Sequence, residues 1–311
     1  IQDSADQVIT VHCEIFIKQA VDGVHISGET VTGVIRLTVD EPTWINSIKT
    51  SLEGTSKCCF LTGCTYYATE EPTASWHFME QQILETLESG SYDYPFDFRL
   101  SNEAPSSFDK TLGLINTVKV AYFIRAKVNV NRFCKDVYCE KEFLVRGNVV
   151  PRAIANGKPA AYPMSKTLIS LCHQKKQEIR VTASIAQSHV KPGNVLHMLF
   201  QIANKTDVDI IGIRSELMRK ITMSERNAVS ASYTKTFKEC SVQTQCAFAN
   251  CEAIMFSLLR VPDGINTIRG LELLSVEYKV KVTMLLPFPH INASTIITVP
   301  IGVSKADDET T

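Results

Sequence analysis

The sequence lacks several features that mark large classes of proteins. Its 311 residues contain no apolar run that approaches the roughly 18–20 residues of a membrane-spanning helix. No basic segment followed by an apolar one stands at its start, so we expect no secretion signal. Neither sign of charge is in excess, because 32 Lys and Arg residues stand against 33 Asp and Glu residues, a formal net charge of -1. Proteins that bind nucleic acid usually carry a basic excess, so we expect no nucleic-acid partner.

Cysteine is present but sparse. The chain has 10 cysteines, far fewer than a small scaffold held together by disulfides, in which cysteine exceeds roughly 8–10%. The tight Cys-x2-Cys pairs of structural zinc sites are missing, and the nearest spacings are the looser Cys134 to Cys139 and Cys246 to Cys251. We therefore expect reduced thiols, which are usual in the cytosol, and neither a metal nor a cofactor.

The chain also lacks the short motifs that carry catalysis. None of its seven histidines stands in a His-Glu-x-x-His motif, and no Gly-x-Ser-x-Gly motif occurs. The glycines do not have the spacing of a nucleotide-binding loop. We therefore expect that the protein is not an enzyme.

What the sequence does contain is alternation of apolar and polar residues with a period of two. Such alternation is typical of half-buried β-strands. Turn residues separate the runs, for example Ser27-Gly28 and Lys191-Pro192-Gly193. Many short strands separated in this way predict antiparallel β-sandwiches. The clearest runs lie at residues 9–17, 31–39, 118–130, 179–185, 196–202 and 276–286.

Residues 78–88 depart from this pattern. The segment reads Phe-Met-Glu-Gln-Gln-Ile-Leu-Glu-Thr-Leu-Glu and is rich in helix-forming residues. Its apolar residues Ile83, Leu84 and Leu87 have roughly helical spacing. The pattern is compatible with a short helix or with a strand and its flanking loop, and it does not decide between the two.

A cluster of proline and glycine between residues 146 and 165 predicts a connector between two domains. Pro151, Pro159 and Pro163 oppose a continuous strand there. We predict an all-β fold of two tandem immunoglobulin-like β-sandwich domains joined by a short linker. The predicted parts are an N-terminal domain at 1–147, a linker at 148–165, a C-terminal domain at 166–303 and a tail at 304–311.

Charge is most uneven at residues 110–135, which hold several Lys and Arg residues and no Asp or Glu. Lys119, Arg125 and Lys127 fall opposite the apolar positions of the strand predicted at 118–130, so the strand presents all three on one side. Such a face suits acidic or phosphorylated peptide tails, or anionic lipid headgroups. The alternative is a solvated sheet face whose basic residues discourage edge pairing. The candidate contact residues are Lys110, Lys119, Arg125, Lys127 and Arg132.

Several longer stretches, in the right order along the chain, resemble the arrestin family. Residues 27–33 read Ser-Gly-Glu-Thr-Val-Thr-Gly, and residues 89–100 read Ser-Gly-Ser-Tyr-Asp-Tyr-Pro-Phe-Asp-Phe-Arg-Leu, similar to arrestin N-terminal domains. In the second half, Lys191-Pro192-Gly193, Asn204-Lys205-Thr206 and the closing strand at 276–280 are similar to arrestin C-terminal domains. Within the family the chain looks most like the α-arrestins, the arrestin domain-containing and thioredoxin-interacting type.

The resemblance implies a non-catalytic adaptor that binds the cytoplasmic tails of membrane receptors or transporters and links them to endocytic sorting or ubiquitination. It places the protein in the cytoplasm and peripherally at the plasma membrane and endosomes. An alternative is an arrestin-fold subunit of an endosomal retromer-type sorting coat. Many α-arrestins recruit ubiquitin ligases through Pro-Pro-x-Tyr motifs in a C-terminal tail. This sequence contains no Pro-Pro dipeptide, so a ligase partner would need a tail outside it.

The resemblance also draws attention to Cys251. In thioredoxin-interacting α-arrestins a cysteine near this position forms a mixed disulfide with thioredoxin. The aromatic residue expected soon after that cysteine is absent here. Cys251 is therefore either a redox-active thiol with thioredoxin as its partner or a passive strand cysteine, since reactivity requires exposure and a lowered pKa.

Overall fold

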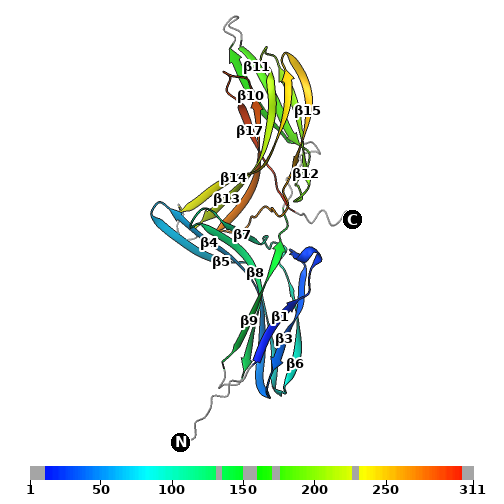
Figure 1. The fold of residues 1–311 in the computed structure, drawn as a ribbon, viewed down its shortest axis with the longest axis vertical. Coiled ribbons are helices and arrows are strands. Elements are labelled where there is room, and N and C mark those ends of the chain that lie inside the picture. The colour runs from blue at the N-terminus through cyan, green and yellow to red at the C-terminus, as the bar shows by residue number, and fades with distance from the viewer. Residues whose placement is uncertain (1–10, 131–134, 150–159, 170–175, 226–230, 303–311) are drawn as a thin grey trace. The chain divides into compact units, whose positions relative to one another are not determined.

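The computed structural model describes residues 11–130, 135–149, 160–169, 176–225 and 231–302. Within these ranges the secondary structure is almost entirely β-strand, and the short 3-10 helix η1 (Val21–Gly23) is the exception (Figure 1). The predicted all-β fold class is thus confirmed. No helix in the described ranges has the length and apolar character needed to cross a membrane.

The chain divides into two compact units. The first consists of Ile1–Asn148 together with the short segments Ser224–Ala231 and Gly270–Leu273, and the second contains the rest of the chain. Most of the predicted linker, residues 150–159, lies outside the described residues, as does the tail at 304–311. The domain boundaries proposed from the sequence stay a prediction.

The first unit contains two sheets. The smaller has the order β1-β3-β6, formed by β1 (Val11–Ile17), β3 (Thr30–Val39) and β6 (Gly90–Arg99). The larger has the order β2-β9-β8-β4-β5, with β7 also paired to β8. In Figure 1 the small sheet lies against β8 and β9. The larger sheet comprises β2 (Val24–Ile26), β4 (Thr43–Thr62), β5 (Thr65–Leu87), β7 (Phe108–Thr111), β8 (Thr117–Val130) and β9 (Val137–Arg146).

Alternating burial explains why the two sheets pack together. Every second residue of β8 is buried, from Val118 to Val130, and so are Phe96 and Phe98 of β6. Each large apolar side chain buried in this way stabilises the fold by about 1.5–3 kcal/mol. Close approach also requires Gly33, because a Cβ atom there would lie 2.3 Å from the carbonyl oxygen of Phe16.

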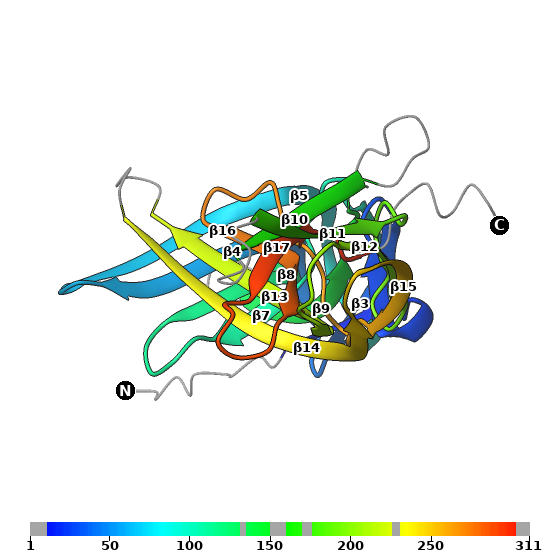
Figure 2. The ribbon, with the colours of Figure 1, turned by 90° about the horizontal axis from the view of Figure 1, so that it is seen from above.

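The ambiguous segment at residues 78–88 is strand up to Leu87. It pairs with β4 over the whole length of β5, and Figure 2 shows the two as one long hairpin. The ladder shifts register between Ile45 and Ser47, and Leu84 adopts a left-handed φ of 53° opposite this shift. Pairing with a long neighbouring strand therefore outweighs the local helix propensity.

The second unit contains two four-stranded sheets, of order β10-β11-β12-β15 and β14-β13-β16-β17. The pairs β10–β11, β11–β12, β12–β15, β13–β16 and β16–β17 are all antiparallel. Buried residues alternate along β12 and β16 and supply much of the core, including Phe200 and Tyr278. The strands are β10 (Ala160–Ile169), β11 (Lys176–Ile185), β12 (Val195–Asn204), β13 (Ile210–Ser224), β14 (Ser232–Phe248), β15 (Cys251–Arg260), β16 (Leu274–Leu285) and β17 (Ala293–Thr298).

Strand β10 begins inside the segment that the sequence assigns to the linker. Residues 160–165 pair with β11, and Pro163 stands within this ladder opposite Thr182. A proline is tolerated there because β10 is an edge strand, so a missing N–H group can face away from the sheet. Strand β10 thus overlaps the last six residues of the predicted linker.

Candidate functional site

Charged side chains cover the outer face of the six-stranded sheet, opposite the buried face of β8. Lys119, Arg125 and Lys127 lie on this one side, as the alternation predicts. Strands β4, β5 and β9 bring further charges beside them through the register of the sheet. We call this surface the β8 charged face and define it as Lys49, Glu53, Lys57, Glu70, Glu80, Lys119, Arg125, Lys127, Asp136, Glu140 and Glu142.

Two pairs of lysines stand directly opposite each other on β4 and β8. Lys49 faces Lys127, and Lys57 faces Lys119. Like charges in cross-strand positions are destabilising unless other groups compensate them. The compensation comes from both flanks of the lysine pairs. Each lysine pairs with its own carboxylate: Lys49 with Glu80 at 3.4 Å, Lys57 with Glu70 at 3.0 Å, Lys119 with Glu142 at 3.0 Å, and Lys127 with Asp136 at 2.8 Å.

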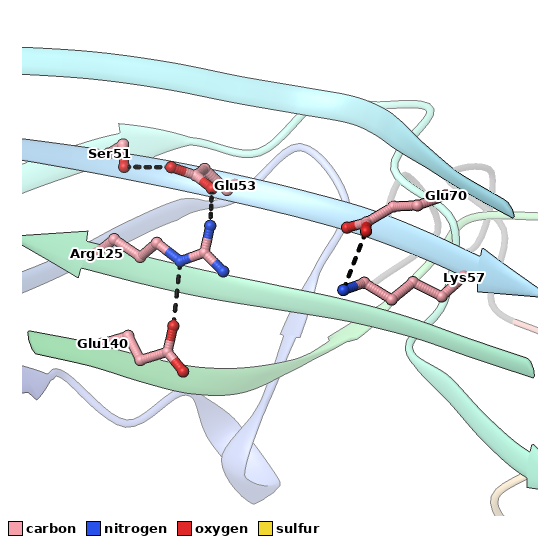
Figure 3. A network of polar contacts seen from close by, with 6 residues as sticks. All are labelled: Ser51, Glu53, Lys57, Glu70, Arg125 and Glu140. Atoms are coloured by element: carbon pink, nitrogen blue, oxygen red, sulfur yellow. Dashed lines mark hydrogen bonds and ion pairs between the residues drawn. The ribbon is translucent and has the colours of Figure 1, made fainter. Parts of the chain in front are cut away.

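Arg125 links three strands of the sheet, as Figure 3 shows. Its guanidinium donates to Glu53 on β4 and, through Nε, to Glu140 on β9 at 3.1 Å. Glu53 also accepts a hydrogen bond from the hydroxyl group of Ser51 at 2.8 Å. The side chain of Glu53 is only 15% exposed, so Arg125 compensates a partly buried carboxylate.

Three of these cations surround a shallow hollow of about 510 Å³ on the outer face. Lys49, Arg125 and Lys127 line it together with the aromatic rings of Phe78 and Tyr138. The Nζ atom of Lys127 lies 5.3 Å from the centroid of the Tyr138 ring, within the range of cation–π attraction. The pKa of Lys127 is raised, and the main cause is its hydrogen bonds to Asp136 and Tyr138. Lys127 therefore stays protonated.

A second hollow, which we call the β1–β9 groove, lies between the edges of β1 and β9. It has a volume of about 640 Å³ and is lined by residues 13–17 of β1 and 139–144 of β9. Strand β1 pairs with β3 on one side and is the end strand of its sheet on the other. Cys139 and Glu140 line both the groove and the hollow beside Arg125, so the two surfaces adjoin along β9.

Cys13 and Cys139 are joined as a disulfide at the rim of the β1–β9 groove. Their Cα atoms are 5.9 Å apart, and they connect the edge of the small sheet with β9 of the large one. The expectation of reduced thiols is therefore wrong for these two residues. The spacing of cysteines along the chain could not reveal the pair, because 126 residues separate them.

His25 lies in the wall of the same groove and is nearly buried, with 6% of its surface exposed. Its ring meets that of Phe143 edge to face, with centroids 5.5 Å apart. Burial lowers the pKa of His25, and the negative charge of Glu29 opposes this shift in part. The groove wall therefore favours a neutral imidazole.

The structure separates some of the residues that the sequence grouped together. Lys110 pairs opposite Val118, which is buried, so it belongs to the other side of the sheet from Lys119. Arg132 lies outside the described residues. Cys251 is the first residue of β15 and is half-buried, and its redox role stays a prediction.

Sequence reasoning missed the carboxylates that surround the basic residues. The basic segment ends at residue 135, and Asp136, Glu140 and Glu142 follow it. The spacing of two between Glu140 and Glu142 on β9 is the signal that places them on one face, next to β8. The β8 charged face is consequently a surface of mixed charge rather than a purely basic one.

The fold and these surfaces define a class of protein: tandem β-sandwiches that offer strand edges and charged strand faces. Among the described residues, no three His, Cys, Asp or Glu side chains gather as a metal site requires. Family comparison agrees with the architecture. The arrestin (or S-antigen) N-terminal domain matches residues 13–150, and the arrestin (or S-antigen) C-terminal domain matches residues 175–305. The chain belongs to the arrestin family.

Its relatives are arrestin domain-containing proteins. Arrestin domain-containing protein 1 of Homo sapiens is 22% identical over 202 residues, which cover 64% of this chain and 45% of that protein. Arrestin domain-containing protein B of Dictyostelium discoideum is 21% identical over 276 residues, which cover 84% of this chain and 41% of that protein. The chain thus spans less than half the length of these relatives. Arrestin-family proteins are generally non-catalytic adaptors, and at this level the chain is adaptor-like.

Proposed function

We propose that the protein is an adaptor that binds the cytoplasmic tails of membrane receptors or transporters and delivers them to endocytic sorting or ubiquitination. The observation that carries this proposal is the convergence of Lys49, Arg125 and Lys127 on one hollow, next to the groove between β1 and β9. An extended tail that is acidic or phosphorylated has the chemistry for both surfaces.

In this proposal the tail lies extended in the β1–β9 groove, where main-chain groups of β1 face it. Main-chain hydrogen bonds supply affinity in this mode, and side-chain pockets supply specificity. The β1–β9 groove gives the tail a channel bounded by the second sheet. Because Glu140 lines both hollows, a tail that leaves the groove across β9 reaches the hollow beside Arg125 within a few residues.

Anionic groups of the tail then displace the carboxylates that bind Lys49 and Lys127 in the free protein. Lys49 and Lys127 are each bound by one carboxylate, and these exposed pairs are individually weak. A phosphate group carries more charge and more acceptor oxygens than a carboxylate, so it competes well for lysines held by a single acid. The mixed charge of the face thereby selects highly anionic tails over weakly acidic ones.

The test is a binding measurement on the whole 311-residue chain. Fluorescence anisotropy with a doubly phosphorylated, extended peptide measures its affinity for the wild type and for the double variant Lys119→Glu with Lys127→Glu. We expect the variant to bind roughly tenfold more weakly. The matched control is Lys205→Glu with Lys281→Glu, which changes the net charge equally at exposed residues of the second unit.

Circular dichroism shows whether each variant stays folded. Equal weakening in the control pair would mean that only net charge matters, and unchanged binding in the Lys119/Lys127 variant would remove this face from the proposal. Vesicles that contain phosphatidylserine replace the peptide in a parallel arm. Vesicle binding without peptide binding would assign the face to anionic lipid instead of to tails.

The proposed location in the cell follows from the membrane proteins whose tails the adaptor would bind. Binding to cytoplasmic tails requires a location in the cytoplasm, peripherally at the plasma membrane and endosomes. Recruitment of a ubiquitin ligase would use sequence outside these 311 residues, because no Pro-Pro dipeptide occurs in them. Affinity capture of the protein with its native termini, followed by identification of membrane clients, tests this part separately.

A further inference from the structure

Strand β15 exposes three large apolar side chains in a row on the outer face of its sheet. Ile254, Phe256 and Leu258 are 65%, 72% and 58% exposed, and we call these three residues the β15 stripe. The residues that alternate with them point inward, where Leu259 is buried opposite the buried Leu196 of β12. Single exposed apolar residues are ordinary, whereas a continuous apolar patch marks a surface that another molecule covers.

Strand β12 widens this apolar centre and gives it a polar border. Leu199 is half-buried and lies directly opposite Phe256 in the ladder between the two strands. His197 and Gln201, both exposed, lie on either side of Leu199 on the same face of the sheet. An apolar centre with a polar border is the usual composition of a protein–protein interface.

The β15 stripe ends in opposite charges. Glu252 precedes the stripe and Arg260 follows it, and both are exposed on the same side of the strand. The outward-facing residues of β15 are therefore Glu, Ile, Phe, Leu and Arg in chain order, with Phe256 in the middle. A row of this kind complements a second copy of itself that runs in the opposite direction.

The backbone edge of β15 is covered by the same chain, so a partner meets the outer face of the strand. Strand β14 ends at Phe248, and two residues later β15 begins at Cys251. Near the other end of β15, the thiol of Cys240 on β14 donates to the carbonyl of Arg260 at 3.3 Å. Side chains, rather than backbone N–H and C=O groups, therefore form the contact.

Two copies of such a face can stack symmetrically in two ways. If the twofold axis runs along β15, Glu252 faces Glu252 of the second copy and Arg260 faces Arg260, so like charges repel each other. If the axis crosses the strands at Phe256, Glu252 faces Arg260 at both ends of the row. Charge complementarity therefore favours the axis that crosses the strands.

The same axis brings apolar side chains together at the centre. Phe256 meets Phe256 of the second copy there, and the two halves of the β15 stripe cover each other. On β12, Leu199 meets Leu199, because it lies opposite Phe256 in the ladder. His197 meets Gln201, whose amide group can exchange a hydrogen bond with the imidazole ring.

The face is large enough for a weak but specific dimer. Neighbouring strands lie about 4.8 Å apart and residues about 3.4 Å apart along a strand, so the four strands over residues 252–260 and their neighbours cover roughly 20 Å by 30 Å. The two copies then bury roughly 1,200 Å² in total, which is at the lower limit of standard interfaces. We therefore expect a dissociation constant of roughly 1–100 µM.

We propose that two copies of this chain dimerise by stacking the outer faces of their β10-β11-β12-β15 sheets, with Phe256 on a twofold axis that crosses the strands. Stacked sheets lie about 10 Å apart with their strands rotated by about 30°, because each sheet is twisted. The surface is isologous, so assembly stops at two copies. The dimer uses the second unit alone and does not depend on tail binding at the β8 charged face.

Sedimentation velocity of the full chain between roughly 1 and 300 µM measures the equilibrium between monomer and dimer. We expect Phe256→Arg to weaken dimerisation at least roughly 30-fold, because two like charges then meet on the axis. The matched control is Ile296→Arg. Ile296 is 60% exposed on β17 of the other sheet, and its substitution is expected to leave the dissociation constant unchanged.

Charge exchange tests the direction of the axis independently of folding. Glu252→Arg alone and Arg260→Glu alone each place like charges opposite each other, so each variant is expected to dimerise more weakly than the wild type. A mixture of the two variants restores both oppositely charged pairs and is expected to give heterodimers. Recovery on mixing cannot come from a variant that fails to fold.

Cysteine cross-linking tests the position of the axis. Facing residues of stacked sheets lie about 10 Å apart, so a short bismaleimide is expected to join two copies of Phe256→Cys. Ala203→Cys is the control, because Ala203 lies opposite Glu252 and its two copies are about 27 Å apart along the strands. Both variants keep the native cysteines, which contribute an equal background.

Three results would overturn the proposal. The first is a chain that stays monomeric at every concentration. The second is a dimer that neither Phe256→Arg nor the charge exchange at positions 252 and 260 affects. The third is equal weakening by Ile296→Arg, which would place the contact elsewhere or make it unspecific.

Discussion

The outer surfaces of β8 and β15 each consist of alternate side chains of one strand, but these side chains meet their partners in different places. On the β8 charged face, Arg125 binds Glu53 of β4 and Lys127 binds Asp136 just before β9, so the sheet and its loop compensate these charges. On β15, Ile254, Phe256 and Leu258 are largely exposed to solvent. A surface with internal partners contributes to the stability of the fold, whereas an uncovered apolar row contributes only when another molecule covers it.

The strongest test of this contrast removes the central cation of the β8 charged face. Arg125→Ala leaves Glu53 partly buried without its guanidinium partner, and we expect the free energy of unfolding to fall by about 1–2 kcal/mol. Urea denaturation followed by tryptophan fluorescence measures the change. Glu140→Gln removes the exposed partner of the same arginine and serves as the control, with an expected loss below about 0.5 kcal/mol. Equal effects of the two variants would contradict the role assigned to Glu53.

The second prediction concerns how the free energy of unfolding depends on pH, through His25 in the β1–β9 groove. Because burial lowers the pKa of His25 from 6.5, the unfolded chain takes up a proton at a higher pH than the folded chain does. This histidine therefore lowers the free energy of unfolding as the pH falls from 6.5 toward its folded pKa. In His25→Gln we expect a shallower fall over that range, measured by denaturation at several pH values. An unchanged slope in His25→Gln would contradict the burial argument.

A smaller effect, on peptide affinity, is expected when Lys127 loses the carboxylate that binds it. Asp136→Asn removes the carboxylate that binds Lys127 at 2.8 Å while keeping the shape of the side chain. The released lysine should bind the doubly phosphorylated peptide roughly two- to fivefold more tightly. Fluorescence anisotropy measures this gain, and Asp263→Asn in a loop of the second unit is the control. Weaker binding in Asp136→Asn would show that the acid positions Lys127 instead of competing with the peptide.

The smallest effect on stability is expected on β15. Ile254→Thr with Leu258→Thr keeps β-branched or strand-compatible side chains at exposed positions, so the free energy of unfolding of the monomer should change by no more than about 0.5 kcal/mol. The measurement is urea denaturation. A loss above about 2 kcal/mol would mean that Ile254 and Leu258 pack within their own unit.

The sequence predicts the strands well where burial alternates over many residues. The run at 118–130 became β8, with Lys119, Arg125 and Lys127 on one side, because period two is a local property of the chain. Residues 78–88 could not be decided in the same way. Their strand conformation depends on β4, which begins more than 30 residues earlier, and their own residues favour a helix.

The composition of the candidate site was harder to predict than its position. The carboxylates that bind Lys49 and Lys57 come from β5, and those that bind Lys119 and Lys127 come from β9 or the residue before it. Such partners depend on strand order and register, which a single sequence does not specify. The Cys13–Cys139 pair is similar, since it joins strands of two different sheets.

The tip of the β4–β5 hairpin offers a practical consequence. Strand β8 pairs with β4 from Ile45 to Cys59, and the hairpin continues beyond that point to the turn at Gly63 and Cys64. Cys64 is exposed, and nothing lies within 4 Å of a Cβ atom added at Gly63. Loop tips of this kind tolerate inserted sequence. The hairpin tip is therefore a ready attachment point for a fluorophore or an affinity tag, at a distance from the core of its sandwich.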